Sequence, residues 1–190
     1  MVNLKLLLTL LTLSVCSQIY TIDLDEAPGR RYSELALYKK DSILSFINYL
    51  KVSVPKFNYA FRIARVMSAK APKWFKHKVG TEFYEECRSI STVLGIPVSD
   101  IVVFNYMYEL GAAHKFCTAI AVSSKNQTLL GRNLDYGFQQ YLANNSIHIQ
   151  YKSRGQVLFE TLGHAGLIGT HTALKRATAD DPHQYAITLN

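Results

Sequence analysis

The sequence predicts an α+β fold in which a helical first half is followed by a half built mainly from strands. Apolar residues recur at helical spacing from about Tyr32 to Leu110, whereas short alternating or continuous apolar runs, typical of strands, begin at Cys117. The change falls near residue 116. With 190 residues and 48% hydrophobic side chains, the chain is long enough for one full-sized core or for part of a larger one.

The first residues have the pattern of a secretory signal peptide. Lys5 precedes a short apolar run at residues 6–13, and small residues follow as far as Ser17. This order of charged, apolar and small residues is that of a signal peptide, and the run is too short to span a membrane. We therefore expect residues 1–18 to be a signal peptide and the protein to enter the secretory pathway.

Before residue 116 the pattern predicts one strand and four helices. The strand alternates apolar and polar residues at 20–24, and a Pro-Gly turn follows at 27–29. The helices are expected at about 32–50, 56–69 and 81–94, and from Ser99, as N-cap, through Leu110.

After residue 116 the pattern predicts two hairpins. One joins residues 117–122 to 128–131 through a turn at 123–126, and the other joins 146–151 to 156–162 around Ser153-Arg154-Gly155. The final residues, 185–190, read as a strand that lacks a neighbour. Because an unpaired apolar strand is an aggregation hazard, we expect a truncated or partial product whose C-terminal half is missing.

Glycosylation sequons and cysteines indicate whether the protein passes through the oxidising secretory pathway. Asn126 and Asn144 begin N-glycosylation sequons in polar stretches that read as loops. Cys16 lies in the signal peptide, which leaves Cys87 and Cys117 in the mature chain. An oxidising compartment permits a disulfide between these two, but a disulfide framework usually has more cysteines, so a free Cys117 is the other alternative.

One segment is basic and aromatic. Residues 42–81 contain no Asp or Glu but eight basic side chains, with seven Phe, Tyr and Trp residues between them. In a secreted protein this composition suggests an anionic membrane surface as partner, contacted by Lys70, Lys73, Trp74 and Lys76. The alternative is a solvated helix face that packs its apolar side on its own core. Nucleic acid suits the charge but not a secreted protein, so we expect no nucleic-acid partner.

A thiol and a polar cluster define the candidate catalytic motif. Cys117 heads an apolar strand, and Arg132 and Asp135 follow at hairpin distance. A thiol needs a base, and the motif contains no histidine. If the peptide bond between Phe116 and Cys117 is cut, the freed α-amine, with a pKa near 8 in peptides, can serve as that base. This is the logic of N-terminal-nucleophile hydrolases.

The residues around this motif resemble the acid ceramidase and N-acylethanolamine acid amidase family of N-terminal-nucleophile cysteine amidases. The similar segments are Phe116-Cys117-Thr118-Ala119-Ile120 and Gly131-Arg132-Asn133-Leu134-Asp135-Tyr136, together with residues 20–25, 30–32 and 105–109 upstream and 163–166 and 188–190 downstream. The resemblance therefore extends over essentially the whole mature chain.

The resemblance implies a lysosomal lipid amidase that cuts itself immediately before the cysteine. Residues 19–116 would form a helical α-subunit region, and residues 117–190 the incomplete start of a catalytic β-subunit with an αββα sandwich fold. An α/β heterodimer would then arise from one precursor, located in the lysosome or secreted. The family's oxyanion-hole asparagine and second arginine have no match here, so we expect residues 1–190 alone to be inactive.

The resemblance also implies residue roles. Cys117 would be the nucleophile of both self-cleavage and catalysis, and Arg132 and Asp135 match site residues of the family. Arg132 can stabilise a thiolate or an oxyanion, and Asp135 can hold the α-amine. Taken singly, a buried cysteine on a core strand and a hairpin ion pair would explain them as well. We expect no cofactor and no metal, since the spacing of His164 and His171 matches no usual zinc site.

The substrate remains a choice among fatty amides in a membrane. Two features resemble the ethanolamide amidases of the family more than the ceramidases: the motif Asp135-Tyr136-Gly137 and the short insert before Gly163. The preferred substrate is therefore an N-acylethanolamine, and ceramide is the alternative. Two further alternatives are a truncated, non-catalytic lipid-binding product and a secreted enzyme for another amide. The long segment before the cysteine argues against the last, because such enzymes begin at the cysteine.

Overall fold

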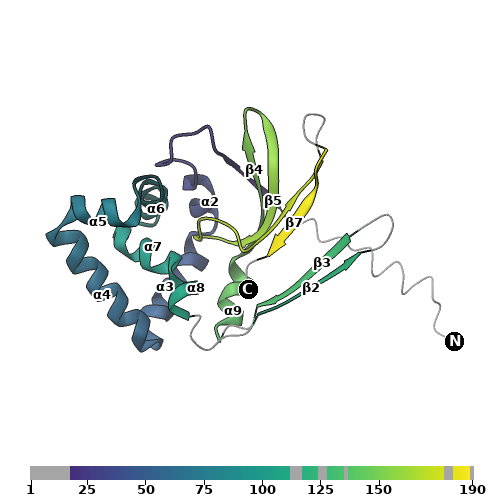
Figure 1. Ribbon diagram of the computed structural model, residues 1–190. Coiled ribbons are helices and arrows are strands. Elements are labelled where there is room, and N and C mark those ends of the chain that lie inside the picture. The colour runs from purple at the N-terminus through teal and green to yellow at the C-terminus, as the bar shows by residue number, and fades with distance from the viewer. Residues whose placement is uncertain (1–17, 112–116, 124–127, 135–136, 178–181, 189–190) are drawn as a thin grey trace.

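The computed structural model describes residues 18–111, 117–123, 128–134, 137–177 and 182–188. Helices cover one face of a five-stranded sheet, and a two-stranded hairpin lies on the opposite side (Figure 1). The predicted α+β class is therefore confirmed. The predicted signal peptide lies outside the described residues.

The helices before the hairpin, which we call the helical half, follow the predicted pattern with two added breaks. They are α2 (Ser33–Tyr38), α3 (Lys40–Ser53), α4 (Pro55–Lys70), α5 (Pro72–Val79), α6 (Thr81–Leu94), α7 (Val98–Asn105) and α8 (Met107–Gly111). The single helix predicted over 32–50 is wrong, because the backbone breaks at Lys39, between α2 and α3. Pro72 opens α5, an element that the pattern did not predict, because proline favours the first turn of a helix.

The last predicted helix of this half begins and ends differently. Its N-cap is Pro97, without a side-chain cap, and Ser99 is buried within the first turn of α7, so the prediction of Ser99 as N-cap is wrong. A second break separates α7 from α8 at Tyr106. The apolar run of α7 therefore ends in the core, and α8 turns toward the sheet.

An aromatic cluster joins the helical half to the sheet half. Phe46 of α3 is fully buried, and its ring centroid lies 5.2 Å from that of Phe104 and 5.3 Å from that of Phe138. Tyr141 of α9 (Gln139–Asn145) stacks on it at 5.4 Å. Since aromatic side chains bury large areas, this cluster is a main source of cohesion between the halves.

A buried carboxylate fastens three helices. Asp100 of α7 is fully buried and accepts hydrogen bonds from Lys51 of α3 at 2.5 Å and from Arg65 of α4 at 2.6 and 2.7 Å. A carboxylate out of water needs such partners, because its desolvation is costly unless it is paired. The three charges therefore fix the relative positions of α3, α4 and α7.

The five-stranded sheet combines the two ends of the chain. Its order is β1-β4-β5-β6-β7, with β1 (Ile19–Asp23), β4 (Ser146–Ser153), β5 (Gln156–His164), β6 (Thr172–Lys175) and β7 (Tyr185–Thr188). The β1 strand pairs with β4 in parallel, and the other pairs are antiparallel. The prediction that the last strand lacks a neighbour is wrong, since β7 pairs with β6, which the pattern did not reveal.

The second sheet is the β2–β3 hairpin, formed by β2 (Cys117–Ser123) and β3 (Thr128–Leu134). The strands pair antiparallel, as the sequence predicts. Two large apolar side chains on β2, Ile120 and Val122, are 61% and 58% exposed. The hairpin thus contributes little to the buried core of the described residues.

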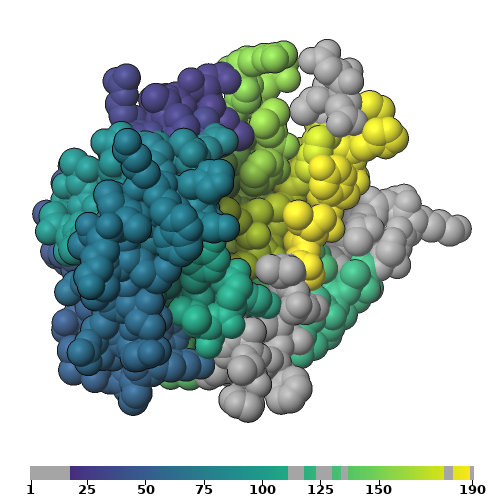
Figure 2. All heavy atoms as spheres, turned by 60° about the vertical axis from the view of Figure 1, so that its left-hand side comes forward, coloured from purple at the N-terminus to yellow at the C-terminus, as the bar shows by residue number. Residues whose placement is uncertain are grey.

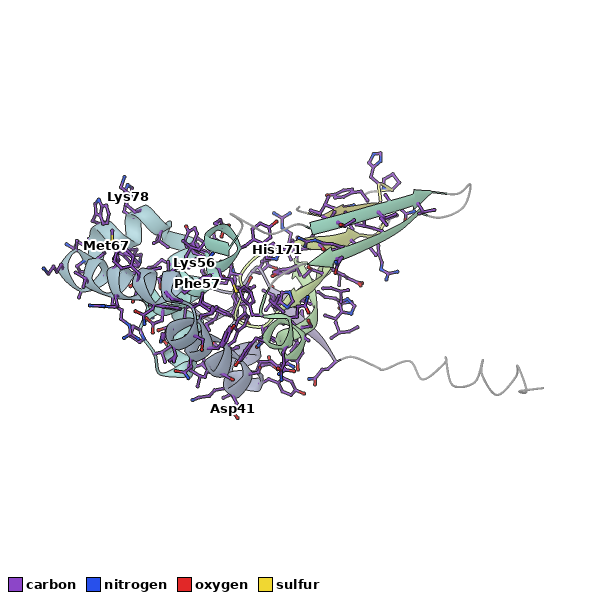
Figure 3. The ribbon with its side chains drawn as sticks, turned by 90° about the horizontal axis from the view of Figure 1, so that it is seen from below. Asp41, Lys56, Phe57, Met67, Lys78 and His171 are labelled. Carbon is purple, nitrogen blue, oxygen red and sulfur yellow. The ribbon has the colours of Figure 1, made fainter. Side chains whose placement is uncertain are left out.

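The helical half forms one broad surface of the molecule, shown in blue and teal in Figure 2. Figure 3 shows Met67 of α4 and Lys78 of α5 at the far end of this half, away from His171, which lies near the strands. Among the described residues, no single helix combines the length and hydropathy needed to cross a bilayer, although the bent pair α6 and α7 passes that test together.

Candidate active site

The register of the hairpin brings the cysteine position close to Arg132. Cys117 pairs with Leu134, and Ala119 pairs with Arg132. Paired residues share a face of the hairpin, and so do residues two apart along a strand. Positions 117 and 132 are therefore diagonal neighbours, roughly 7–8 Å apart. Asp135 and Phe116 lie outside the described residues.

Arg132 connects the hairpin to the five-stranded sheet. Its Nη1 donates hydrogen bonds of 3.2 Å to the carbonyl oxygen of His171 and of 3.2 Å to Oγ1 of Thr172. Both acceptors lie where the chain enters β6. Both bonds come from the same nitrogen, so they hold Nη1 of Arg132 against the start of β6.

His171 lies at the same place and packs against the helical half. Its ring stacks on that of Tyr108 in α8, with centroids 4.8 Å apart and planes tilted by 26°. Burial, and then the charge of Arg132, lower the pKa of His171, and Glu109 opposes the shift. The imidazole is therefore kept neutral to lower pH than an exposed histidine, which avoids a second positive charge beside Arg132.

His164, at the end of β5, is half-buried and lies against the chain around Leu142. Its Nδ1 lies 3.2 Å from the carbonyl oxygen of Leu142 and 3.4 Å from Oγ of Ser146. Burial is the main cause that lowers the pKa of His164 to about 4. The described residues contain no group of three His, Cys, Asp or Glu side chains that could hold a metal ion.

Cys87 takes no part in this site. It is fully buried in α6, and it is free, so the alternative of a disulfide with Cys117 is wrong. Burial, the largest cause, raises the pKa of the Cys87 thiol far above its usual value. A thiol that stays protonated is a poor nucleophile, which leaves Cys87 a core residue.

The four residues predicted to contact a membrane differ in their surroundings. Lys70 and Lys73 are exposed, and Trp74 is 46% exposed. Lys76 instead forms an ion pair with Glu85 of α6 and lies 5.5 Å from the ring centroid of Tyr84. Of the four, Lys70, Lys73 and Trp74 are therefore open to solvent at the α4–α5 junction, whereas Lys76 links α5 to α6.

The two predicted glycosylation sites are placed differently. Asn144 is exposed at the end of α9, so the prediction that its sequon lies in a loop is wrong. Its neighbour Asn145 is fully buried and bonds to the backbone of Ser42 and Tyr141. Asn126 lies outside the described residues.

The structure adds neighbours that the motif did not reveal. Tyr108 and Thr172 lie 24 residues before and 40 residues after Arg132 along the chain, and neither belongs to a chemical motif. The segment 105–109 stood out in the sequence only through the family resemblance. Contacts across such separations depend on the packing of α8 against the sheet.

Comparisons with known proteins bear on the family of the chain. A family model described as the beta subunit of N-acylethanolamine-hydrolyzing acid amidase matches residues 18–75. The acid ceramidases of human and of Balaenoptera acutorostrata scammoni are each 30% identical over 185 residues, which cover 90% of this chain. The chain belongs to the family of acid ceramidase and N-acylethanolamine-hydrolyzing acid amidase.

A third relative in the family bears the other name. The N-acylethanolamine-hydrolyzing acid amidase of Caenorhabditis elegans is 29% identical over 178 residues. The chain spans 44% of the length of the two acid ceramidases and 47% of the nematode amidase. The matches thus cover nearly all of this chain and less than half of each relative.

Proposed function

We propose that this protein is a lipid amidase that hydrolyses fatty-acid amides, with Cys117 as an N-terminal nucleophile. The observation that carries the proposal is the hairpin register, in which positions 117 and 132 are diagonal neighbours while Arg132 is held by His171 and Thr172. A guanidinium beside a thiol favours the thiolate and stabilises the oxygen anion that forms when the thiolate attacks an amide carbonyl.

The base is generated by the protein itself. The Cys117 thiol attacks the carbonyl carbon of Phe116, and the peptide C–N bond breaks as the acyl group moves to sulfur, which frees the α-amine of Cys117 with the thiol proton. Water then hydrolyses the thioester and releases the carboxylate of Phe116 and the thiol. That amine then takes the thiol proton in each turnover and passes it to the leaving amine. Asp135 orients the α-amine. The product is an α/β heterodimer of residues 19–116 and the chain that starts at Cys117.

The preferred substrate is an N-acylethanolamine. The order Asp135-Tyr136-Gly137 and the short insert before Gly163 support it. Ceramide is the second candidate, because relatives named acid ceramidase match at 30% identity, compared with 29% for the nematode amidase. Measuring products from both lipids in one reaction separates the candidates.

The proposed setting is an anionic membrane inside the secretory pathway, in the lysosome or outside the cell. Lys70, Lys73 and Trp74 are exposed together at the α4–α5 junction, and the exposed Tyr59, Ile63 and Val66 recur at helical spacing on α4. Cations beside a row of apolar side chains suit the interface of an anionic bilayer. Glycosylation at Asn126 and Asn144 belongs to the same proposal.

A non-catalytic lipid-binding product is the remaining alternative. It is favoured by the exposed Lys70, Lys73 and Trp74, which lie on the helical half and not on the β2–β3 hairpin. An uncleaved chain that still binds vesicles would support this alternative.

Self-cleavage tests the proposal directly. We expect the full-length protein at acidic pH to yield two fragments, the second beginning Cys-Thr-Ala-Ile, while Cys117→Ala stays in one piece because no nucleophile remains. N-terminal sequencing and gel mass report the result. Cys87→Ala is the matched control and should cleave normally. Efficient cleavage of Cys117→Ala would rule out the mechanism.

A further inference from the structure

Asn105, the last residue of α7, lies between the helical half and the segment that holds Arg132. Its Nδ2 donates to the carbonyl oxygen of Gly166 at 3.0 Å, and its Oδ1 accepts a 2.6 Å bond from the backbone N–H of Ile168. The same Nδ2 also lies 2.9 Å from the carbonyl oxygen of Ile101 in α7. One carboxamide therefore fixes both ends of a three-residue turn to a helix of the core.

The turn that Asn105 holds has little freedom to adjust. Gly166 has a φ of +85°, and a Cβ at this position would meet Ile43 and Phe104 at 3.0 Å. The preceding Ala165 is fully buried and donates its N–H to the carbonyl oxygen of Asn145 at 2.7 Å. The backbone of residues 165–168 is therefore packed directly on the core and anchored by hydrogen bonds.

The same segment ends at the acceptors of Arg132. Three residues after Ile168 the chain reaches His171, whose carbonyl oxygen accepts from Nη1 of Arg132, and Thr172 provides the second acceptor. The His171 ring is stacked on Tyr108, and the hydroxyl of Thr161 donates to the carbonyl oxygen of Thr172 at 2.5 Å. The turn that Asn105 holds therefore leads within three residues to the two acceptors of Arg132.

We propose that Asn105 is a positioning residue for Arg132, acting through residues 166–172. Its role in catalysis rests on the proposed function of Arg132, whereas its effect on the guanidinium does not. An aspartate of the same shape would still accept from Ile168 but could not donate to Gly166. An alanine would leave both backbone groups without this partner, and small misplacements of catalytic groups cost large factors in rate.

The first test measures the guanidinium itself in the 190-residue chain. With ¹⁵N-labelled arginine, the Arg132 side-chain resonance is the one that disappears in Arg132→Lys. We expect Asn105→Ala and Asn105→Asp to shift it and to speed exchange of its N–H protons with water by roughly fivefold or more, the factor for one lost hydrogen bond. Asn58→Ala is the matched control. Asn58, on α4, also donates from its side chain to a backbone carbonyl oxygen, that of Lys51, but this bond joins α4 to α3 and involves none of residues 166–172.

The outcomes separate positioning from general stability. A folded Asn105 variant with an unchanged Arg132 resonance, even with a lowered melting temperature, overturns the inference. Asn105→Asp keeps the volume of the side chain and provides the test if Asn105→Ala does not fold. Near-ultraviolet circular dichroism shows which variants retain native packing.

The second test measures turnover in the full-length protein with a soluble fluorogenic amide. We expect Asn105→Asp to lower kcat by roughly tenfold to a hundredfold with little change in KM, because the reacting geometry and not the binding surface is disturbed. A changed Arg132 resonance with normal kcat would support the positioning contact and count against the proposed role of Arg132. A loss confined to KM would overturn the inference.

Discussion

The helical half and the β2–β3 hairpin keep their residues in place by different means. In the helical half, Phe46, Phe57 and Phe104 are completely buried, and Asp100 binds two cations inside the protein. In the hairpin, Ile120 and Val122 are more than half exposed, and Arg132 connects it to the other sheet through His171 and Thr172. The buried contacts that stabilise the fold are therefore concentrated in the helical half. The candidate catalytic residues lie on the hairpin, whose position depends on the hydrogen bonds of Arg132.

Truncating one apolar side chain in each region should show the contrast most clearly. We expect Phe46→Ala to lower the free energy of unfolding by about 3–5 kcal/mol, because it leaves a cavity between Phe104, Phe138 and Tyr141. Ile120→Ala, already exposed, should change it by about 0.5 kcal/mol or less. Urea unfolding measures both. A comparable loss in the two variants would mean that the hairpin belongs to the core.

His164, which lies on the five-stranded sheet and contacts α9 and β4, should make stability depend on pH. The folded protein binds a proton on His164 only near pH 4, whereas an unfolded chain binds it near 6.5. Stability from this histidine is thus present above about pH 6.5 and is lost as the pH falls toward 4, by up to about 3 kcal/mol.

His164→Asn should remove the share of that dependence that comes from His164, because an amide nitrogen can still donate to Leu142 but does not titrate, and His171, whose pKa is also lowered, keeps a smaller share. Thermal unfolding at intervals between pH 4 and 7 gives the slope, and the exposed His77→Asn on α5 is the control. If His164→Asn retains the slope of the wild-type protein, another group is responsible.

Arg132→Lys should change chemistry far more than stability. Lysine keeps the charge but loses the planar pair of donors, so we expect turnover in the full-length protein to fall by about a hundredfold, as when one oxyanion donor is removed. The melting temperature should change little. Near-normal turnover in both Arg132→Lys and Asp135→Asn would show that the proposed site is wrong.

The outer surface of the helical half should contribute binding without affecting the fold. Replacing Lys70 and Lys73 by Gln should weaken binding to anionic vesicles by about 1 kcal/mol for each lysine, on the order of thirtyfold together, and less at high salt. Vesicle sedimentation measures it. Lys175→Gln on β6 is the control, and an equal loss there would remove the argument for a local surface.

Lys76 should behave differently from its neighbours, because it is already paired with Glu85. The sequence placed all three lysines in one basic segment, and only packing separates them. Charge reversal at Lys76 would combine an effect on the α5–α6 contact with any effect on lipid. A clean test of membrane binding therefore leaves Lys76 unchanged.

Long periodic elements could be predicted from the sequence, and short ones could not. The apolar periodicity located α4 and α6, and alternation located β1, the β2–β3 hairpin and the β4–β5 hairpin. The seven-residue α9 is mostly polar and is held by the burial of Phe138 and Leu142, and β6 has only four residues. Such elements form because tertiary contacts stabilise them, and they leave no period in the sequence.

The candidate site shows the same division. The spacing of Cys117 and Arg132 predicted that a hairpin returns Arg132 toward the cysteine, although the predicted strand ended at Gly131 and the register comes from the structure. The partners of Arg132 could not be predicted, because His171 and Thr172 reach it through a turn held by Asn105, 63 residues before Ile168. Local sequence patterns predict the hairpin, whereas the packing of α7 and α8 determines which residues contact Arg132.

The parallel pairing of β1 with β4 has a consequence for the order of events during synthesis. Ile19 pairs with His148, so the ribosome must add roughly 130 residues after β1 before its partner exists. At about 5–20 residues per second this takes roughly 6 to 26 seconds, long enough for the intervening helices to fold first. A cut between residues 116 and 117 within that interval would release a helical fragment with β1 still unpaired. If the proposed self-cleavage occurs, it must therefore be slower than translation for β1 and β4 to pair in one sheet.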